Sequence, residues 1–113
     1  MADHIKVNKA QGTWVVRAGG AVIAESTNAL ELNEAGLPPV IYFPRSDIAM
    51  AFLDPTERRS HIPDKGDAHF FSIVSKSQTL EDAAWSYEDP KEHVAAIKDH
   101  IAFYPDKVAV ERL

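Results

Sequence analysis

Two adjacent glycines constrain the fold of the first part of the chain. Gly19 and Gly20 divide the stretch TWVVRAGGAVIAES into two runs rich in valine, isoleucine and alanine. Glycine readily adopts the positive φ angles that two-residue hairpin turns require. The pattern therefore predicts an antiparallel hairpin in which residues 13–18 pair with residues 21–26.

Short apolar runs separated by turn residues continue along the rest of the chain. The stretch DIAMAFL carries apolar residues on both faces of an extended chain, which predicts a central strand. Further strands are predicted at VIYF before Pro44, at residues 68–75 and 83–88, and at IAFYP and KVAVERL near the C-terminus.

Helix signals occur at two places. Ser26, Thr27 or Asn28 could cap a helix of about two turns that ends at Gly36. Pro90, followed by KEHVAAIKDH, predicts a second short helix. The expected fold class is mainly β: a compact curled antiparallel sheet, or a barrel-like structure of the β-tent type, with two short helices.

Length and composition limit the classes of protein to consider. A chain of 113 residues fits one domain, and 45% hydrophobic residues suffice for a core. The chain has no cysteine, which excludes disulfides, thiolate zinc sites and thiol catalysis. A net charge of −5 argues against a nucleic-acid partner. No apolar run is long enough to span a membrane, so we expect a cytoplasmic protein without a membrane partner, and a homodimer remains open.

Polar residues gather between aromatic strands. Residues 43–72 contain Arg-x-Asp, Arg-Arg, His-x-Pro and Lys-Gly, and Trp85 and Tyr87 are predicted on one face of a strand. We expect an aromatic cleft for a small planar or anionic metabolite, with the polar segment across its mouth. The candidate ligand-binding residues are Tyr42, Arg45, Asp47, His61, Lys65, Trp85 and Tyr87.

Lys65 is the expected anchor for a carboxylate or phosphate. It precedes Gly66 in a turn, where its ammonium can lie beside exposed backbone N–H groups. An anchoring cation contributes little to a core, so removing Lys65 is expected to weaken binding and leave the melting temperature almost unchanged.

Other readings of the same residues remain open. Arg45 and Asp47 suit a structural ion pair at the Pro44 corner, and the aromatic residues suit simple core packing. An enzyme of hydrolase, lyase or transferase type could use His61 or Lys65 as its acid–base group, with Arg45 holding an anion. A scaffold for protein contacts is a third reading.

A metal site is the least favoured reading. Four potential ligands occur within nine residues, but their spacing matches no established metal signature, and we expect neither a metal nor a cofactor. These four residues are His61, Asp64, Asp67 and His69.

Four motifs, in order, resemble those of the domain of unknown function 427 family. They read PPVIYFPRSDI from Pro38, HIPDKGDAHF from His61, AAWSYEDP from Ala83 and AFYPDKVAV from Ala102. The family is also labelled nucleotidyltransferase-like, but the sequence shows neither a phosphate-cradling glycine loop nor paired carboxylates for magnesium.

The resemblance implies a fold similar to the tent-shaped β domains of methionine sulfoxide reductase B and of the drug-binding domain of cereblon. Those domains often hold zinc through two cysteine pairs, which this chain lacks. Ile62 stands where the family usually has a cysteine before Pro63. Neither a zinc site nor thiol chemistry is therefore implied for this chain.

Overall fold

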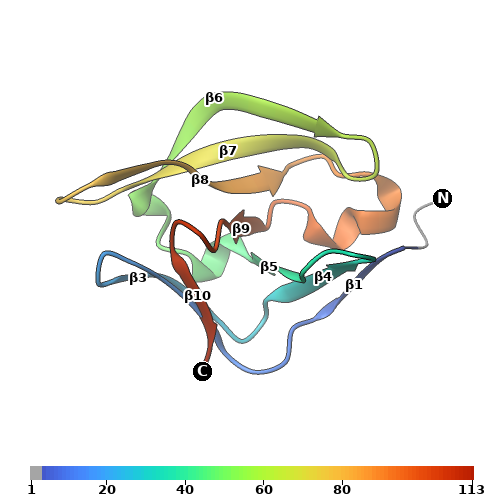
Figure 1. The fold of residues 1–113 in the computed structure, drawn as a ribbon, viewed down its shortest axis with the longest axis horizontal. Helices are drawn as coiled ribbons and strands as arrows, with labels where there is room; N and C mark the ends of the chain where they lie inside the picture. The colour runs from blue at the N-terminus through green and yellow to red at the C-terminus, as the bar shows by residue number, and fades with distance from the viewer. Residues whose placement is uncertain (1–3) are drawn as a thin grey trace.

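The computed structural model describes residues 4–113, which form two antiparallel sheets (Figure 1). One sheet has seven strands in the order β1-β4-β5-β9-β8-β7-β6, and the other has three in the order β10-β2-β3. The strands are β1 (Ile5–Lys9), β2 (Trp14–Ala18), β3 (Ala21–Ser26), β4 (Leu30–Glu34), β5 (Val40–Phe43), β6 (Leu53–Ile62), β7 (Gly66–Val74), β8 (Thr79–Tyr87), β9 (Ile101–Phe103) and β10 (Ala109–Arg112).

Helical structure is limited to three short 3₁₀ segments. They are η1 (Arg45–Asp47), η2 (Met50–Phe52) and η3 (Glu92–Ile97). In residues 4–113, no helix has the length and apolar character needed to cross a bilayer.

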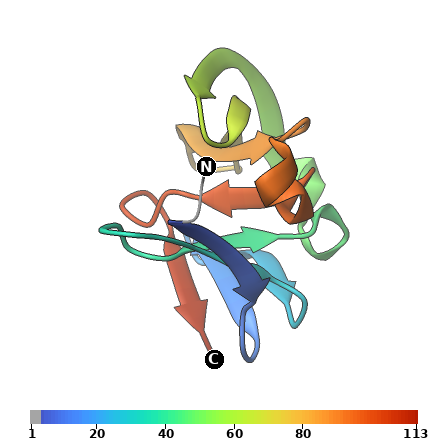
Figure 2. The ribbon, with the colours of Figure 1, turned by 90° about the vertical axis from the view of Figure 1, so that its right-hand side faces the viewer.

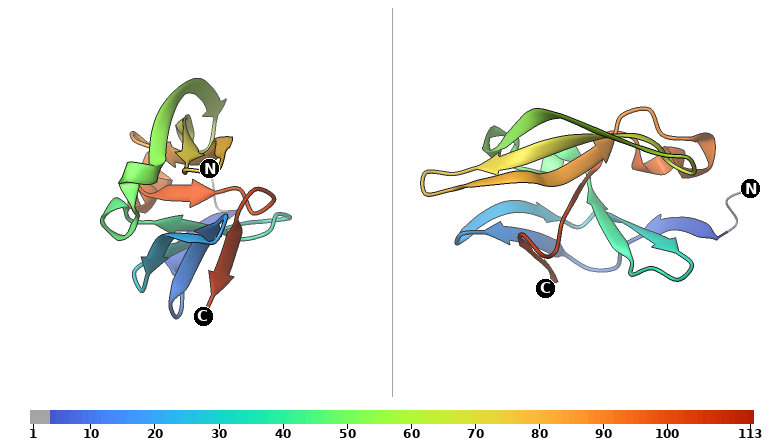
Figure 3. Two further views of the ribbon diagram at one scale, coloured as in Figure 1. Left: turned by 90° about the vertical axis from the view of Figure 1, so that its left-hand side faces the viewer. Right: turned by 45° about the horizontal axis from the view of Figure 1, so that its top comes forward.

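The seven-stranded sheet is joined at its centre by β9. This strand has only three residues, all buried, and it pairs with β5 on one side and with β8 on the other. We call β5, β4 and β1 the lower wing and β8, β7 and β6 the upper wing. Figures 2 and 3 show the sheet curling about β9, so that the two wings face each other. The outer strands β1 and β6 do not pair, so the described sheet is curled and not closed into a barrel.

A row of cross-strand neighbours runs through this centre. Ala102 of β9 lies opposite Tyr42 of β5 and opposite Trp85 of β8. The side chain of Ala102 is small and fully buried. The indole Nε1 of Trp85 therefore reaches past it and donates a hydrogen bond to the Tyr42 hydroxyl at 3.2 Å.

Two hydrophobic clusters cover the two faces of the seven-stranded sheet. One includes Phe43, Phe71 and Ile101 and packs against Val16 and Ile23 of the three-stranded sheet. The other lies between the wings, where Leu32, Tyr42 and Phe70 meet Val94 and Ile97 of η3. Strand residues alternate between these faces, so each wing supplies side chains to both clusters.

The predicted hairpin is confirmed. β2 and β3 pair in antiparallel register, and Gly19 and Gly20 have φ angles of 56° and 84°. The strands predicted at VIYF, at residues 68–75 and at residues 83–88 correspond to β5, β7 and β8. The two C-terminal strands also form, as β9 and β10, but they belong to different sheets.

The helix predicted between Ser26 and Gly36 is wrong, because this segment forms strand β4. The Ser26 hydroxyl does accept a hydrogen bond from the Asn28 N–H, at 2.9 Å, but it stabilises a turn that leads into a strand. Gly36, with φ of 83°, lies in the turn between β4 and β5 and does not end a helix. Pairing of β4 with both β1 and β5 outweighs these local helix signals.

The strand predicted at residues 47–53 is also wrong. The segment forms η1 and η2, and Ile48 makes a single bridge to Ala24 of β3. The Ala49 N–H donates to the Ile23 carbonyl at 2.8 Å, so the segment crosses the edge of the three-stranded sheet without extending it. The second predicted helix exists as the 3₁₀ segment η3, with Val94 and Ile97 buried.

β6 is the longest strand and forms one edge of the large sheet. Its pairing with β7 is interrupted between Pro55 and Arg59. In the same region the Arg58 guanidinium lies over the Phe70 ring, 4.5 Å from its centroid. β6 therefore curves over β7 instead of continuing the upper wing as a flat edge.

Ala102→Leu should destabilise the protein, because the larger side chain has no room between Tyr42 and Trp85. We expect the free energy of unfolding to fall by about 1–3 kcal/mol, the usual cost of overpacking a core. Chemical denaturation would measure this change. Ala109→Leu, at an exposed position of β10, is the matched control. Equal stability of the two variants would contradict this account of β9.

Candidate functional site

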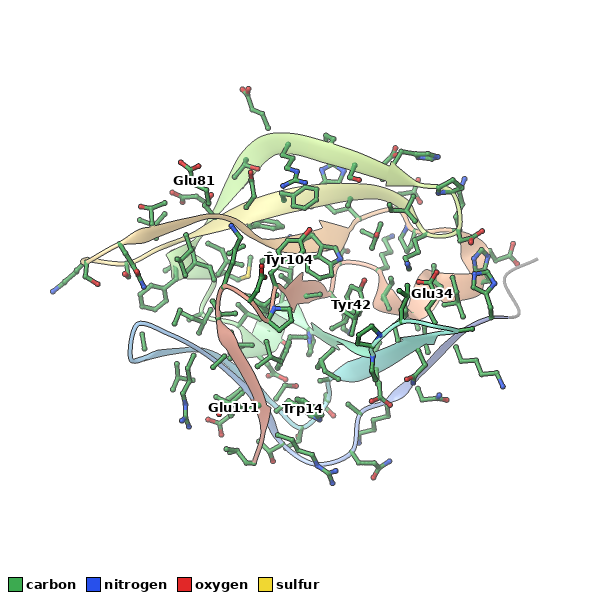
Figure 4. All side chains as sticks on the ribbon, in the orientation of Figure 1. Trp14, Glu34, Tyr42, Glu81, Tyr104 and Glu111 are labelled. Carbon is green, nitrogen blue, oxygen red and sulfur yellow. The ribbon has the colours of Figure 1, made fainter. Side chains whose placement is uncertain are left out.

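The two wings enclose a cavity of about 220 Å³, which we call the wing cavity. The lower wing contributes Leu32, Glu34, Val40 and Tyr42, and the upper wing contributes Ser60, Ile62, Ala68, Phe70, Trp85 and Tyr87. Leu37 and Pro38, from the loop between β4 and β5, complete the wall together with Lys65 and Tyr104. Figure 4 shows Glu34, Tyr42 and Tyr104 in the space between the wings.

Four residues predicted from the sequence line this cavity together. Tyr42, Lys65, Trp85 and Tyr87 come from β5, from the turn between β6 and β7, and from β8. Trp85 and Tyr87 face the same side of their strand, as the alternation of side chains predicts. The curl of the sheet brings Tyr42 and Lys65 to that side.

Lys65 does not stand free at the mouth of the cavity. Its ammonium donates a hydrogen bond to the Glu34 carboxylate at 2.7 Å, and the two side chains are only 14% and 18% exposed. The cavity wall therefore carries a positive and a negative group side by side. Glu34 could not be predicted as a site residue, because this contact joins residues 31 positions apart in a predicted helix and a predicted loop.

Three aromatic rings form another part of the wall. The rings of Tyr42 and Trp85 meet edge to face, with centroids 6.2 Å apart, and Tyr104 lies 4.5 Å from Trp85. Tyr104 was not among the predicted site residues, although it lies in the motif AFYPDKVAV. The three rings form a continuous aromatic boundary, with one edge-to-face contact and one tilted contact between them.

Burial favours the neutral form of two phenol groups in the cavity wall, those of Tyr42 and Tyr87. Loss of hydration raises the pKa of Tyr87 to about 12, and the negative charge of Glu34 acts in the same direction. Burial likewise raises the pKa of Tyr42. Both phenols can therefore donate hydrogen bonds as neutral groups.

Arg45 and Asp47 lie in other surroundings, where both hold the chain in place. The Arg45 guanidinium donates to the Asp99 carbonyl at 2.7 Å and to the Glu88 carboxylate at 3.1 Å. It also bonds to the Ser86 hydroxyl, which itself donates to the His100 carbonyl. The expected pairing of Arg45 with Asp47 is replaced, since the Asp47 carboxylate accepts a hydrogen bond from the Ser26 hydroxyl at 2.6 Å.

His61 also points away from the wing cavity. Ser60 and Ile62 line the cavity, so His61, between them in β6, faces the opposite side of the sheet. Its Nδ1 lies 2.6 Å from the Asp67 carboxylate, and the His61 side chain is 61% exposed. Hydrogen bonding to His61 lowers the pKa of the Asp67 carboxyl. The expected sharing of one ligand by His61 and Lys65 therefore does not fit this geometry.

One group of side chains near the cavity has the composition of a metal site. The ligand atoms of His4, Glu34 and Asp64 all lie within 4.8 Å of one another. The His4 Nε2 atom is 3.3 Å from the Asp64 carboxylate. The Lys65 ammonium already occupies one oxygen of Glu34 and would repel a cation there. We therefore assign no metal to this group.

Replacing Lys65 alone should destabilise the protein, contrary to the expectation from sequence. Lys65→Met leaves the Glu34 carboxylate largely buried without its partner, which should cost about 1–3 kcal/mol of unfolding free energy. The double variant Lys65→Met, Glu34→Gln removes both charges and should recover most of the loss. Thermal and chemical denaturation would measure both effects, with the exposed Lys98→Met as control. A stable single variant would show that the pair contributes little.

The raised pKa of Tyr87 predicts a loss of stability in base. A tyrosine in the unfolded chain ionises near pH 10, whereas Tyr87 in the folded protein ionises near pH 12. Its contribution is fully present below pH 10 and is lost as the pH rises toward 12. Denaturation at pH 9 and pH 11.5 should show a smaller decline for Tyr87→Phe than for the original chain. Equal declines in stability for the two proteins would contradict the raised pKa of Tyr87.

The sequence match to a known family extends over almost the whole chain. The family model described as Domain of unknown function (DUF427), with the label NTP_transf_9, matches residues 6–113. A comparison with curated proteins gave no match. The matched residues include every strand that lines the wing cavity. The chain therefore belongs to the DUF427 family.

Proposed function

We propose that the protein binds a small planar ligand in the wing cavity. The observation that carries this proposal is the meeting of Tyr42, Lys65, Trp85 and Tyr87 around one hollow, although they come from three separate parts of the chain. Apolar walls with a few convergent polar groups are the usual form of a small-molecule site.

The size of the cavity favours a single-ring ligand. Its volume of about 220 Å³ lies below the range of about 300–1,000 Å³ that is typical of sites for drug-sized molecules. The rings of Trp85, Tyr87 and Phe70 offer flat surfaces against which a planar group can pack.

The charges of the wall favour a neutral ligand over an anionic one. An anion that approached Lys65 would also meet the Glu34 carboxylate, and a cation that approached Glu34 would meet the Lys65 ammonium. A neutral group with a hydrogen-bond donor beside an acceptor, such as a carboxamide, can bond to both. It also avoids the cost of burying an additional charge.

Binding is better supported than acid–base catalysis. The Lys65 ammonium is already bonded to Glu34, so it does not stand free in the cavity to act on a ligand. His61, the other candidate, lies outside the cavity with Asp67. No second function is proposed.

Benzamide and benzoate test this proposal, because they have nearly the same shape and differ in charge. The protein should bind benzamide more tightly than benzoate. Glu34→Gln frees the Lys65 ammonium and should shift the preference toward benzoate about tenfold or more, as expected for a charged hydrogen bond. Isothermal titration would measure both dissociation constants.

Asp67→Asn is the matched control, because it removes an exposed carboxylate outside the cavity. This variant should prefer benzamide over benzoate to the same extent as the original chain. A preference for benzoate in the original chain, or an unchanged preference in Glu34→Gln, would overturn the proposal.

A further inference from the structure

A second hollow adjoins the wing cavity. This hollow, which we call the outer groove, has a volume of about 520 Å³ and lies between the two sheets. It shares Leu37, Pro38, Val40 and Trp85 with the wing cavity. The remaining lining residues are Trp14, Glu31, Pro39, Ile41, Phe103, Pro105 and Val110.

The outer groove differs in chemistry from the wing cavity. Among its described lining residues Glu31 alone carries a charge, and its carboxylate accepts a hydrogen bond from the Asn33 side chain at 3.2 Å. The Trp14 indole N–H donates to the Gln11 carbonyl at 3.1 Å. The remaining lining residues are apolar, so the groove offers mainly apolar surface to an occupant.

Leu37 marks the boundary between the two hollows. Its side chain lines both of them, yet the residue is 59% exposed. The tight turn at Gly36, where the Leu37 N–H donates to the Glu34 carbonyl at 3.0 Å, holds it there. A ligand that passed from one hollow to the other would cover this apolar side chain.

We infer that the ligand has two parts: a planar head that donates and accepts hydrogen bonds in the wing cavity, and a hydrocarbon extension that lies in the outer groove. This inference rests on the proposed function and narrows the ligand to an amphipathic class. The polar pair of Lys65 and Glu34 recognises the head. The extension passes Trp85 and Leu37 and packs against Trp14, Phe103 and Val110.

Benzamides with an alkyl chain at the ring carbon opposite the carboxamide, from methyl to pentyl, are suitable probes. Each methylene that enters the groove should tighten binding about fourfold, which corresponds to about 0.8 kcal/mol per buried methylene. The gain in affinity per methylene should end when the alkyl substituent fills the groove.

The two tryptophans of the chain distinguish a ligand confined to the wing cavity from one that also enters the outer groove. Trp14 lines only the outer groove, whereas Trp85 lies between the groove and the wing cavity. In NMR titrations, benzamide should shift the indole N–H resonance of Trp85 alone. The pentyl compound should shift the resonances of both tryptophans.

Val110→Gln and Val22→Gln form a matched pair of variants. Val110 lines the outer groove, whereas Val22, on β3, is 47% exposed and lines neither hollow. Val110→Gln should abolish most of the gain from the alkyl chain and leave the affinity for benzamide unchanged. Val22→Gln should change neither.

The outcomes separate the inference from the proposed function. If benzamide binds but the alkyl chain adds no affinity and Trp14 does not shift, the extension into the groove is refuted and the wing cavity stands. If the gain persists in Val110→Gln, the extension lies elsewhere and the inference is again refuted. If no compound of the series binds, the inference and the proposed neutral head both fail.

Discussion

The shortness of β9 is the constraint on which the rest of the structure depends. Three buried residues join the two halves of the large sheet, and each half is free to bend away from the other beyond them. A longer central strand would keep the halves in one continuous twist and would leave less space between them. Within β9, the methyl side chain of Ala102 lets Trp85 approach Tyr42 across the strand. The cavity and its aromatic wall therefore both follow from the short strand β9 and its small central residue, Ala102.

The polar side chains of the segment 43–72 have two distinct roles in the structure. Arg45 ties η1 to β8 and to the segment that precedes β9, and Asp47 ties it to the end of β3. These contacts hold the corner after β5 and so stabilise the lower wing against the upper one. Lys65, in contrast, faces inward and is matched by a carboxylate. A cationic side chain in a motif does not by itself indicate an anionic ligand.

Much of the fold could be predicted from local pattern, because β2, β3, β5, β7 and β8 combine β-forming residues with clear turn signals. Strand β4 could not be predicted in this way, since Ser26 and Gly36 are equally suited to helix ends and to turns. Pairing with β1 and β5 makes this segment a strand. At the site, the shared face of Trp85 and Tyr87 follows from strand alternation. The contact between Lys65 and Glu34 does not, because it depends on how far the sheet curls. His61 was misplaced for a similar reason: a segment expected to be a loop became a strand with two faces.

The irregular edge strand β6 also affects how molecules meet one another. An exposed strand of ten residues would ordinarily offer its free backbone groups to a neighbouring chain and extend the sheet from molecule to molecule. Pro55 has no N–H to offer, and the interrupted register up to Arg59 bends the strand away from a straight ladder. The missing N–H and the bend both leave β6 a poorer template for a second strand than a straight edge of the same length would be.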